Sequence, residues 1–343
     1  MSSFHNIPTN IISGFLGAGK TTAIQYLIAH KPVSETWAIV VNEFGQIGVD
    51  GKLLKNNDVA VKEIPGGCLC CVASQSFSVG LNQIIKQYKP HRIIIEPTGL
   101  GHPKKLIETL TSSYYESVLD LRAVINLVDA RNLSESKYLE HDTFVDQIKM
   151  ADILLASKLD QYQEKDRQVF YNYVYQLTQQ TNMPKAHIAM IQQGELKLEW
   201  LNIKHDLLRT ASFSKSHNSH ESHGHAVNFS NDINYTGWQV VEGHTDGYSS
   251  LSWHLDKSIS FNADNLVRWL NDIRTELSID RIKGVLRHSN DWFAINMTEH
   301  ESDISNIEPS ATNIIEMISS SELNAHQLDD QLRLHCDNSR VRS

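Results

Sequence analysis

The sequence predicts an α/β fold in which a mainly parallel sheet is flanked by helices, followed by a small α+β domain. Short apolar runs, typical of buried strands, alternate along the first part of the chain with segments of helical spacing. One such segment carries Ala23, Ile24, Leu27 and Ile28 at the spacing of a buried helix face. Strands and helices that alternate in this way indicate a parallel sheet covered on both faces. The predicted strands span residues 10–13, 38–41, 59–64, 92–95, 121–128, 153–156 and 188–191.

Polar or glycine-rich residues follow almost every one of these predicted strands directly. The carboxyl ends of parallel strands open on one edge of the sheet, where ligands bind. We therefore expect the residues that follow the strands to surround a single site. The segments brought together in this way are 14–22, 42–45, 66–68, 96–99, Asp129 and 157–160.

The remainder of the chain predicts a linker and a second domain. We divide the sequence into a first domain at 1–210, a linker rich in serine, asparagine and histidine at 211–245, and a second domain at 246–336. In the second domain, Asn262 is placed to cap a helix. The apolar face of that helix consists of Leu266, Trp269, Leu270, Ile273 and Leu277. Strands are predicted at 249–255, 282–287, 292–297 and 313–318, and a final helix at 322–334.

Composition narrows the classes of partner. The chain has 343 residues and a formal net charge of -9, which repels a phosphate backbone and argues against nucleic acid as a partner. No apolar run approaches the roughly twenty residues that span a bilayer, and residues 1–7 lack the pattern of a secretory signal. We therefore expect a cytoplasmic protein with no membrane partner. In such a reducing compartment, clustered cysteines bind metal or do chemistry.

Residues 14–21 match the phosphate-loop pattern G-x-x-x-x-G-K-[ST] in full, between a predicted strand and a predicted helix. Backbone N–H groups of such a loop cradle phosphates, Lys20 reaches the β- and γ-phosphates, and Thr21 binds Mg²⁺. The alternative is a glycine-rich turn of another kind, against which the strand and helix argue. The predicted phosphate-binding residues are Gly14, Phe15, Leu16, Gly17, Ala18, Gly19, Lys20, Thr21 and Thr22.

Two acidic residues are candidates for work near the magnesium ion. Glu96 follows an aliphatic strand, where a nucleotide hydrolase needs an acidic group close to Mg²⁺. With Lys20 and Thr21 it forms the predicted catalytic set, and it either holds the ion through water or positions the attacking water. A helix cap or a surface carboxylate is the alternative. Glu43 follows the second predicted strand. Its carboxylate is a candidate ligand of Mg²⁺ or of a second metal, and the alternative is that it binds neither.

The segment Ser157-Lys158-Leu159-Asp160 resembles the guanine-specific element N-K-x-D. In that element the aspartate accepts hydrogen bonds from the guanine N1–H and the exocyclic amine. Ser157 replaces the asparagine and removes an amide that would brace the pocket. We predict that Lys158 and Asp160 bind the base, which makes GTP and GDP the expected nucleotides.

Cys68, Cys70 and Cys71 lie on one short loop after Pro65-Gly66-Gly67, residues that let the backbone bend sharply. Three thiolates suit a soft or borderline ion such as Zn²⁺ or Cu⁺. The alternatives to a metal site are that these cysteines pack as small buried side chains, or that Cys70 and Cys71 form a vicinal disulfide. A closed structural zinc site has four protein ligands, so three suit an ion that is handed over. Equally, a loop that moves with the nucleotide could supply the fourth ligand.

Histidines are concentrated in the predicted linker, where imidazoles can bind divalent metals weakly. A solvated linker with incidental histidines is an equal alternative. Cys336 lies in a polar tail, and we expect it to have no part in a metal site. The linker histidines are His217, His220, His223 and His225.

These motifs together resemble the CobW family of metal-handling GTPases. Cys68-Leu69-Cys70-Cys71 matches the C-x-C-C hallmark of that family, and residues 281–287 are similar to part of its C-terminal domain. The resemblance implies GTP hydrolysis, zinc binding and delivery of zinc to a metalloprotein client. GTPases that handle metal often pair across the nucleotide face, so a homodimer or a higher oligomer fits the resemblance. The positions that depart from the family pattern are Gln46, Gln193 and Ser157.

Two other functions stay open alongside a zinc-handling GTP phosphohydrolase. A P-loop kinase acting on a small molecule usually has a lid of arginines, and the segments flanking Glu96 offer only Arg92 and Arg122. The other alternative is a metal-storing or redox-sensing protein in which nucleotide turnover is vestigial. Lys20 and Thr21, together with Glu96, argue against it.

Overall fold

The computed structural model describes residues 6–41, 59–63, 75–101, 103–180, 186–209, 226–227, 237–245, 247–310 and 312–337. The chain divides into two compact units, residues 1–218 and 219–343, and the boundary falls within the predicted linker. None of the helices in these ranges combines the length and the apolar character that a membrane crossing requires.

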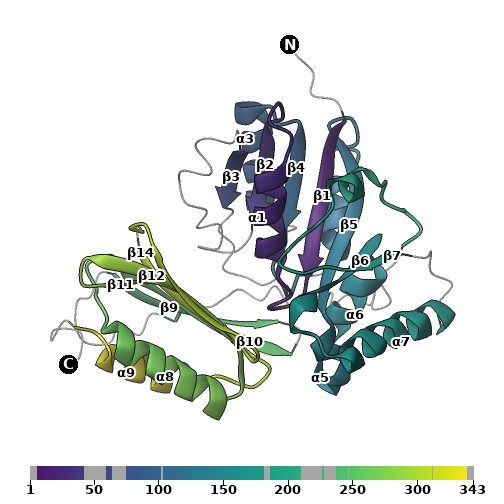
Figure 1. The fold of residues 1–343 in the computed structure, drawn as a ribbon. Helices are drawn as coiled ribbons and strands as arrows, with labels where there is room; N and C mark the ends of the chain where they lie inside the picture. The colour runs from purple at the N-terminus through teal and green to yellow at the C-terminus, as the bar shows by residue number, and fades with distance from the viewer. Residues whose placement is uncertain are drawn as a thin grey trace. The chain divides into compact units, whose positions relative to one another are not determined.

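The described residues of the first unit form a seven-stranded parallel sheet with the order β3-β2-β4-β1-β5-β6-β7 (Figure 1). This order confirms the predicted parallel α/β class. Each predicted strand overlaps an observed one. The strands are β1 (Ile7–Gly14), β2 (Trp37–Val41), β3 (Val59–Glu63), β4 (Arg92–Glu96), β5 (Leu119–Asp129), β6 (Ile153–Ser157) and β7 (His187–Met190).

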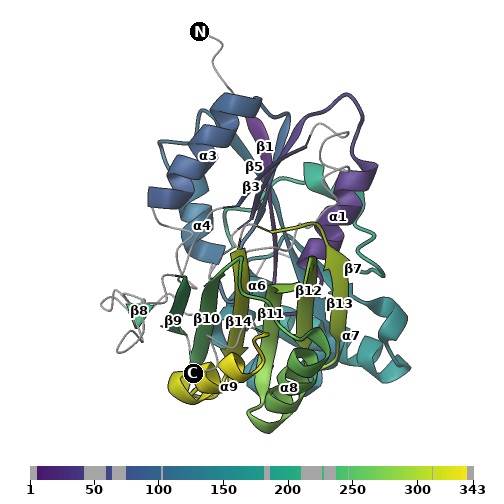
Figure 2. The same ribbon diagram turned by 90° about the vertical axis from the view of Figure 1, so that its left-hand side faces the viewer.

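Helices cover both faces of this sheet, with α3 and α4 on one side and α1 on the other (Figure 2). The central strands bury both faces, because successive side chains of a strand point to opposite sides. In β4, Ile93 and Ile95 pack with α3 and α4, while Ile94 between them packs with α1. The helices are α1 (Lys20–His30), α3 (Gln75–Tyr88), α4 (Pro103–Leu110), α5 (Ser136–Leu139), α6 (Asp142–Lys149) and α7 (Glu164–Gln180).

The second unit is an antiparallel sheet with the order β13-β12-β11-β14-β10-β9-β8, and α8 and α9 cover one face of it (Figure 1). The side chain of Asn262 accepts a hydrogen bond from the backbone N–H of Asn265, which confirms the predicted helix cap. The elements are β8 (Ala226–Val227), β9 (Trp238–Thr245), β10 (Tyr248–Asp256), α8 (Ala263–Glu276), β11 (Ile279–His288), β12 (Asp291–Thr298), β13 (Ser302–Ile307), β14 (Thr312–Ser319) and α9 (Ala325–Leu334).

The sheet of the second unit differs from the sequence expectation at three strands, β8, β9 and β13. β8 and β9, at residues 226–227 and 238–245, lie inside the segment expected to be linker, and Trp238 and Val240 of β9 pack with the core of the second unit. β13 was not predicted, since its sequence lacks apolar alternation and the strand forms by pairing with β12. The last helix begins at Ala325, capped by the side chain of Asn324, three residues after the predicted start at 322.

Candidate functional site

The phosphate-loop motif connects the end of β1 to the start of α1, as its pattern predicts. Gly14 has a φ of 149°, and a Cβ there would lie 2.6 Å from the carbonyl oxygen of Leu127 on β5. Gly19, directly before α1, has a φ of 88° in the left-handed region. Both positions therefore require glycine, which leaves the loop free to turn its backbone N–H groups inward.

Lys20 is buried at the start of α1, and its ammonium group lies inside the curve of the loop. Its Nζ donates hydrogen bonds to the carbonyl oxygen of Gly14 at 2.9 Å and to that of Phe15 at 3.4 Å. This position lets the ammonium group reach a phosphate bound within the loop.

Thr21 in the first turn of α1 and Glu96 at the end of β4 lie close together. The Thr21 hydroxyl donates a hydrogen bond to Oε1 of Glu96 at 3.1 Å, and the glutamate is only 3% exposed. A hydroxyl and a carboxylate are oxygen ligands of the kind that Mg²⁺ prefers, often with water completing its octahedral shell. The donor atoms at this point therefore fit a magnesium ion.

The loop that follows Glu96 packs against the phosphate loop. A Cβ at Gly99 would lie 2.9 Å from Cδ2 of Leu16, so the two loops are in close contact. From α6, the side-chain amide of Gln147 donates to the carbonyl oxygens of Gly99 at 3.0 Å and Gly101 at 3.1 Å. Gln147 is 1% exposed and fixes this loop, and nothing in its local sequence marked it.

The predicted base-binding residues lie after β6. Asp160 is exposed on a single 3₁₀ turn, Leu159–Gln161, and Lys158 precedes it with a φ of 59°. Ser157 is buried, and its hydroxyl donates to the carbonyl oxygen of Val128 on β5 at 3.3 Å. The serine thus braces the loop through the neighbouring strand. The structure brings Lys158 to the same edge as the phosphate loop, because both follow strands of one parallel sheet.

Asp129 at the end of β5 supports this loop through a buried cluster of charges. The Arg131 guanidinium donates to both of its carboxylate oxygens, and the Lys158 ammonium lies 3.7 Å away. Burial acts to raise the pKa of Asp129, but the Arg131 hydrogen bonds and the Lys158 charge outweigh it and hold that pKa below its ordinary value. The Tyr162 hydroxyl accepts from the backbone N–H of Ala130 at 2.7 Å, and burial raises the pKa of this phenol.

Residues 8–185 match the family model described as the CobW/HypB/UreG nucleotide-binding domain. The chain belongs to the CobW/HypB/UreG family. This result confirms the resemblance inferred from the motifs.

Individual relatives extend the match beyond the nucleotide-binding domain. The chain is 36% identical over 330 residues to the zinc chaperone YeiR of Escherichia coli, with 94% of this chain and 96% of that protein covered. It is 28% identical over 192 residues to the zinc chaperone CobW of Pseudomonas aeruginosa, with 47% of this chain and 51% of that protein covered. The solved structure of Zn(II)-bound YjiA GTPase from E. coli aligns at a TM-score of 0.42 and 17% identity, covering 95% of this chain and 97% of that one.

Cys68, Cys70 and Cys71 of this CobW/HypB/UreG chain lie outside the described residues, as do Glu43, Gln46 and the linker histidines. The strands that precede their segments are described. Val41, where β2 ends, pairs with Glu96 on one side and with Glu63, the end of β3, on the other. Neighbouring strands lie about 4.8 Å apart, so the backbone of Glu63 is about 10 Å from that of Glu96. β3, the strand that precedes the cysteine segment in the sequence, therefore ends at the edge of the sheet that carries the phosphate loop.

Two further predicted positions are described. Gln193 is exposed in a tight turn with Gly194, and a Cβ at Gly194 would lie 2.7 Å from the backbone of Thr22. The departure from the family pattern at Gln193 thus lies beside the end of the phosphate loop. Cys336, which we expected in a polar tail, is instead buried in the apolar core of the second unit.

Proposed function

We propose that this protein is a GTP-dependent zinc chaperone. It hydrolyses GTP to GDP and phosphate, and it couples hydrolysis to the transfer of zinc from Cys68, Cys70 and Cys71 to a metalloprotein client. The observation that carries the proposal is the contact between Thr21 and Glu96 beside a complete phosphate loop. The zinc chaperone YeiR, similar over nearly the whole chain, supports the metal-handling part.

The phosphate chemistry rests on residues around the loop. Backbone N–H groups of residues 14–19 bind the phosphates, and Lys20 neutralises charge that develops on the γ-phosphate. Thr21 and Glu96 would hold Mg²⁺, which would supply positive charge to stabilise the phosphate oxygens. Glu96 ends a buried strand and is fixed by the sheet, so little reorganisation is needed when the nucleotide binds.

Base recognition rests on Asp160 and Lys158. The Asp160 carboxylate accepts hydrogen bonds from the guanine N1–H and amino group, which adenine cannot offer in that arrangement. The aliphatic stem of Lys158 packs on the base, while its ammonium group is held near Asp129.

Zinc is the cargo in this scheme, held by thiolates that follow β3. Three thiolates leave one coordination position for a client ligand, and the client completes the tetrahedral site as it takes the ion. The nucleotide state changes zinc affinity if a segment near the γ-phosphate contributes to the same site.

Two measurements test the proposal. The first is GTP turnover without any acceptor, which a small-molecule kinase would not support, with ATP as the comparison nucleotide. The second is a zinc competition titration of the wild type and Cys68→Ser, each with a GTP analogue or GDP bound. We expect tighter zinc binding by the wild type and a difference between nucleotide states. Equal zinc affinity of the two proteins would refute the cysteine site, and equal affinity in both nucleotide states would refute the coupling.

A further inference from the structure

Strand β13 forms one edge of the antiparallel sheet in the second unit, and no described strand pairs with its outer side. Residues 302–306 are all exposed, and Ile304 among them is 45% exposed. Edge strands present unpaired backbone N–H and C=O groups, and proteins commonly protect them with proline, lysine or a bulge. β13 contains neither proline nor lysine, and its pairing with β12 is regular from 302 to 307. This edge is therefore open to an added strand.

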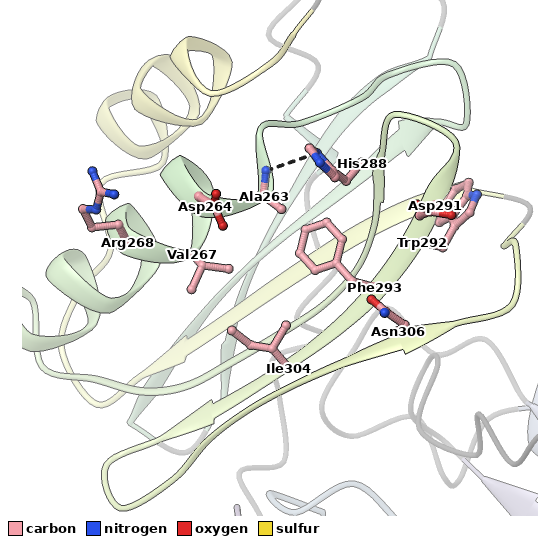
Figure 3. A pocket seen from close by; sticks show the side chains of 10 residues that line it. All are labelled: Ala263, Asp264, Val267, Arg268, His288, Asp291, Trp292, Phe293, Ile304 and Asn306. Atoms are coloured by element: carbon pink, nitrogen blue, oxygen red, sulfur yellow. Dashed lines mark hydrogen bonds between the residues drawn. The ribbon is translucent and has the colours of Figure 1, made fainter.

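A cavity of about 460 Å³ lies beside this edge, between the start of α8 and strands β12 and β13 (Figure 3). The side chains of Val267, Phe293 and Ile304 point toward the same space and give it an apolar wall. Ile304 and Asn306 pair with Ile295 and Phe293, so their side chains lie on the helix-covered face of the sheet. The volume is within the range of pockets that bind organic groups.

The charged residues around the cavity and the edge strand are mainly acidic. Asp264 and Asp291 line the cavity and are exposed. Asp303 on β13 and Glu308 directly after it are exposed as well. Arg268 is the cavity residue that carries a fixed positive charge. A partner that approaches this surface therefore gains from basic residues of its own.

We propose that β13 and the adjacent cavity form a binding site for an extended, basic segment of a partner protein. The segment adds a strand to the sheet by backbone hydrogen bonds to β13. Because side chains alternate along a strand, one large apolar side chain of the segment enters the cavity, and basic residues two positions away from it point to the same face, near Asp264 and Asp291. A small molecule would use the cavity but not the edge. This inference rests on no part of the proposed function.

The test is a binding titration of the full-length chain, without nucleotide or zinc. The probe is a fluorescein-labelled peptide in which lysine alternates with valine around one central phenylalanine, and the readout is fluorescence anisotropy. Three modified peptides separate the contributions. Alanine for phenylalanine removes the cavity contact, glutamate for lysine reverses the charge, and N-methylation of alternate backbone amides removes the strand pairing.

A protein variant with a matched control complements the peptides. Ile304→Ser removes an apolar wall of the cavity without a change of charge. Leu277→Ser makes the same kind of change at a residue that is 38% exposed and lies outside the cavity lining. We expect Ile304→Ser to weaken binding about tenfold and Leu277→Ser to leave it unchanged. Circular dichroism melting shows whether each variant is folded. If Ile304→Ser does not fold, the series of modified peptides tests the proposal without it.

The proposal is supported if the parent peptide binds saturably and each modified peptide binds at least about fivefold more weakly. It is overturned if the parent peptide does not bind, or if the N-methylated or glutamate peptide binds equally well. It is also overturned if N-acetylphenylalanine amide alone binds as tightly as the peptide, because the cavity would then be a small-molecule site.

Discussion

Gln147 is the residue whose replacement tests the site geometry most directly. Its amide group donates to two carbonyl oxygens of the loop after Glu96, and its own Oε1 has no hydrogen-bond partner among the described residues. Gln147→Leu keeps the size of the side chain and removes both donors. Loss of the two hydrogen bonds to buried carbonyl oxygens lowers the free energy of unfolding by about 2–4 kcal/mol. Removal of the unpartnered Oε1 raises it again by about 1 kcal/mol. The expected net loss of unfolding free energy is therefore about 2 kcal/mol.

That loss has two measurable consequences. For a unit of this size it lowers Tm by about 4–8 °C. The loop packs against Leu16, so its release should also lower kcat for GTP about tenfold, while the affinity for GDP changes little because the phosphate loop keeps its own hydrogen bonds. The assays are thermal melting, steady-state turnover and titration with a fluorescent GDP analogue.

Gln83→Leu is the matched control, because Gln83 is an exposed glutamine on α3. It should leave both Tm and kcat unchanged. An unchanged kcat in Gln147→Leu would refute the positioning role. A loss of GDP affinity as large as the loss of kcat would show instead that the whole phosphate loop had lost its structure.

Three further predictions concern charge. Glu96→Gln should raise the Mg²⁺ concentration for half-maximal GTP turnover about tenfold, because a neutral amide binds the ion less strongly, and a magnesium titration checks this. Asp160→Asn should shift preference from GTP toward xanthosine triphosphate, since its amide donates to the 2-oxo group that replaces the guanine amine; competition between the two nucleotides measures the shift. The depressed pKa of Asp129 means that it stabilises the fold above its unfolded pKa of about 4 and loses this contribution as pH falls through the lower folded value. Asp129→Asn should therefore lower stability at neutral pH and flatten the acid limb of a plot of Tm against pH.

Local motifs predicted the parts of the site that depend on contiguous residues. The phosphate loop is one turn between a strand and a helix, so its sequence pattern contains the glycines and the lysine that the geometry needs. Glu96 was predictable because a run of β-branched residues ends directly before it. The parallel sheet followed from the alternation of apolar runs with helical spacing.

Tertiary contacts were not predictable in the same way. Gln147 lies 46 and 48 residues from the carbonyl groups it binds, and Tyr162, which follows β6, accepts a hydrogen bond from the backbone N–H of Ala130, which follows β5. Such buried polar contacts leave no period in the sequence. β13 was missed for a related reason, since an edge strand with exposed polar side chains shows no apolar alternation.

The register of β3, β2 and β4 constrains how nucleotide and zinc can be coupled in the proposed function. Glu63, Val41 and Glu96 pair side by side within one hydrogen-bonded sheet, and Val40 and Ile95 beside them are buried. A close-packed sheet has low compressibility, so the ends of its neighbouring strands move little relative to one another. We therefore expect Glu63, the last residue of β3, to stay fixed relative to Glu96 when the nucleotide changes. We therefore expect a difference in zinc affinity between the GTP and GDP states to arise in the segments that follow Val41 and Glu63. Substitutions of the buried residues Val40 and Ile95 should change stability without changing the coupling.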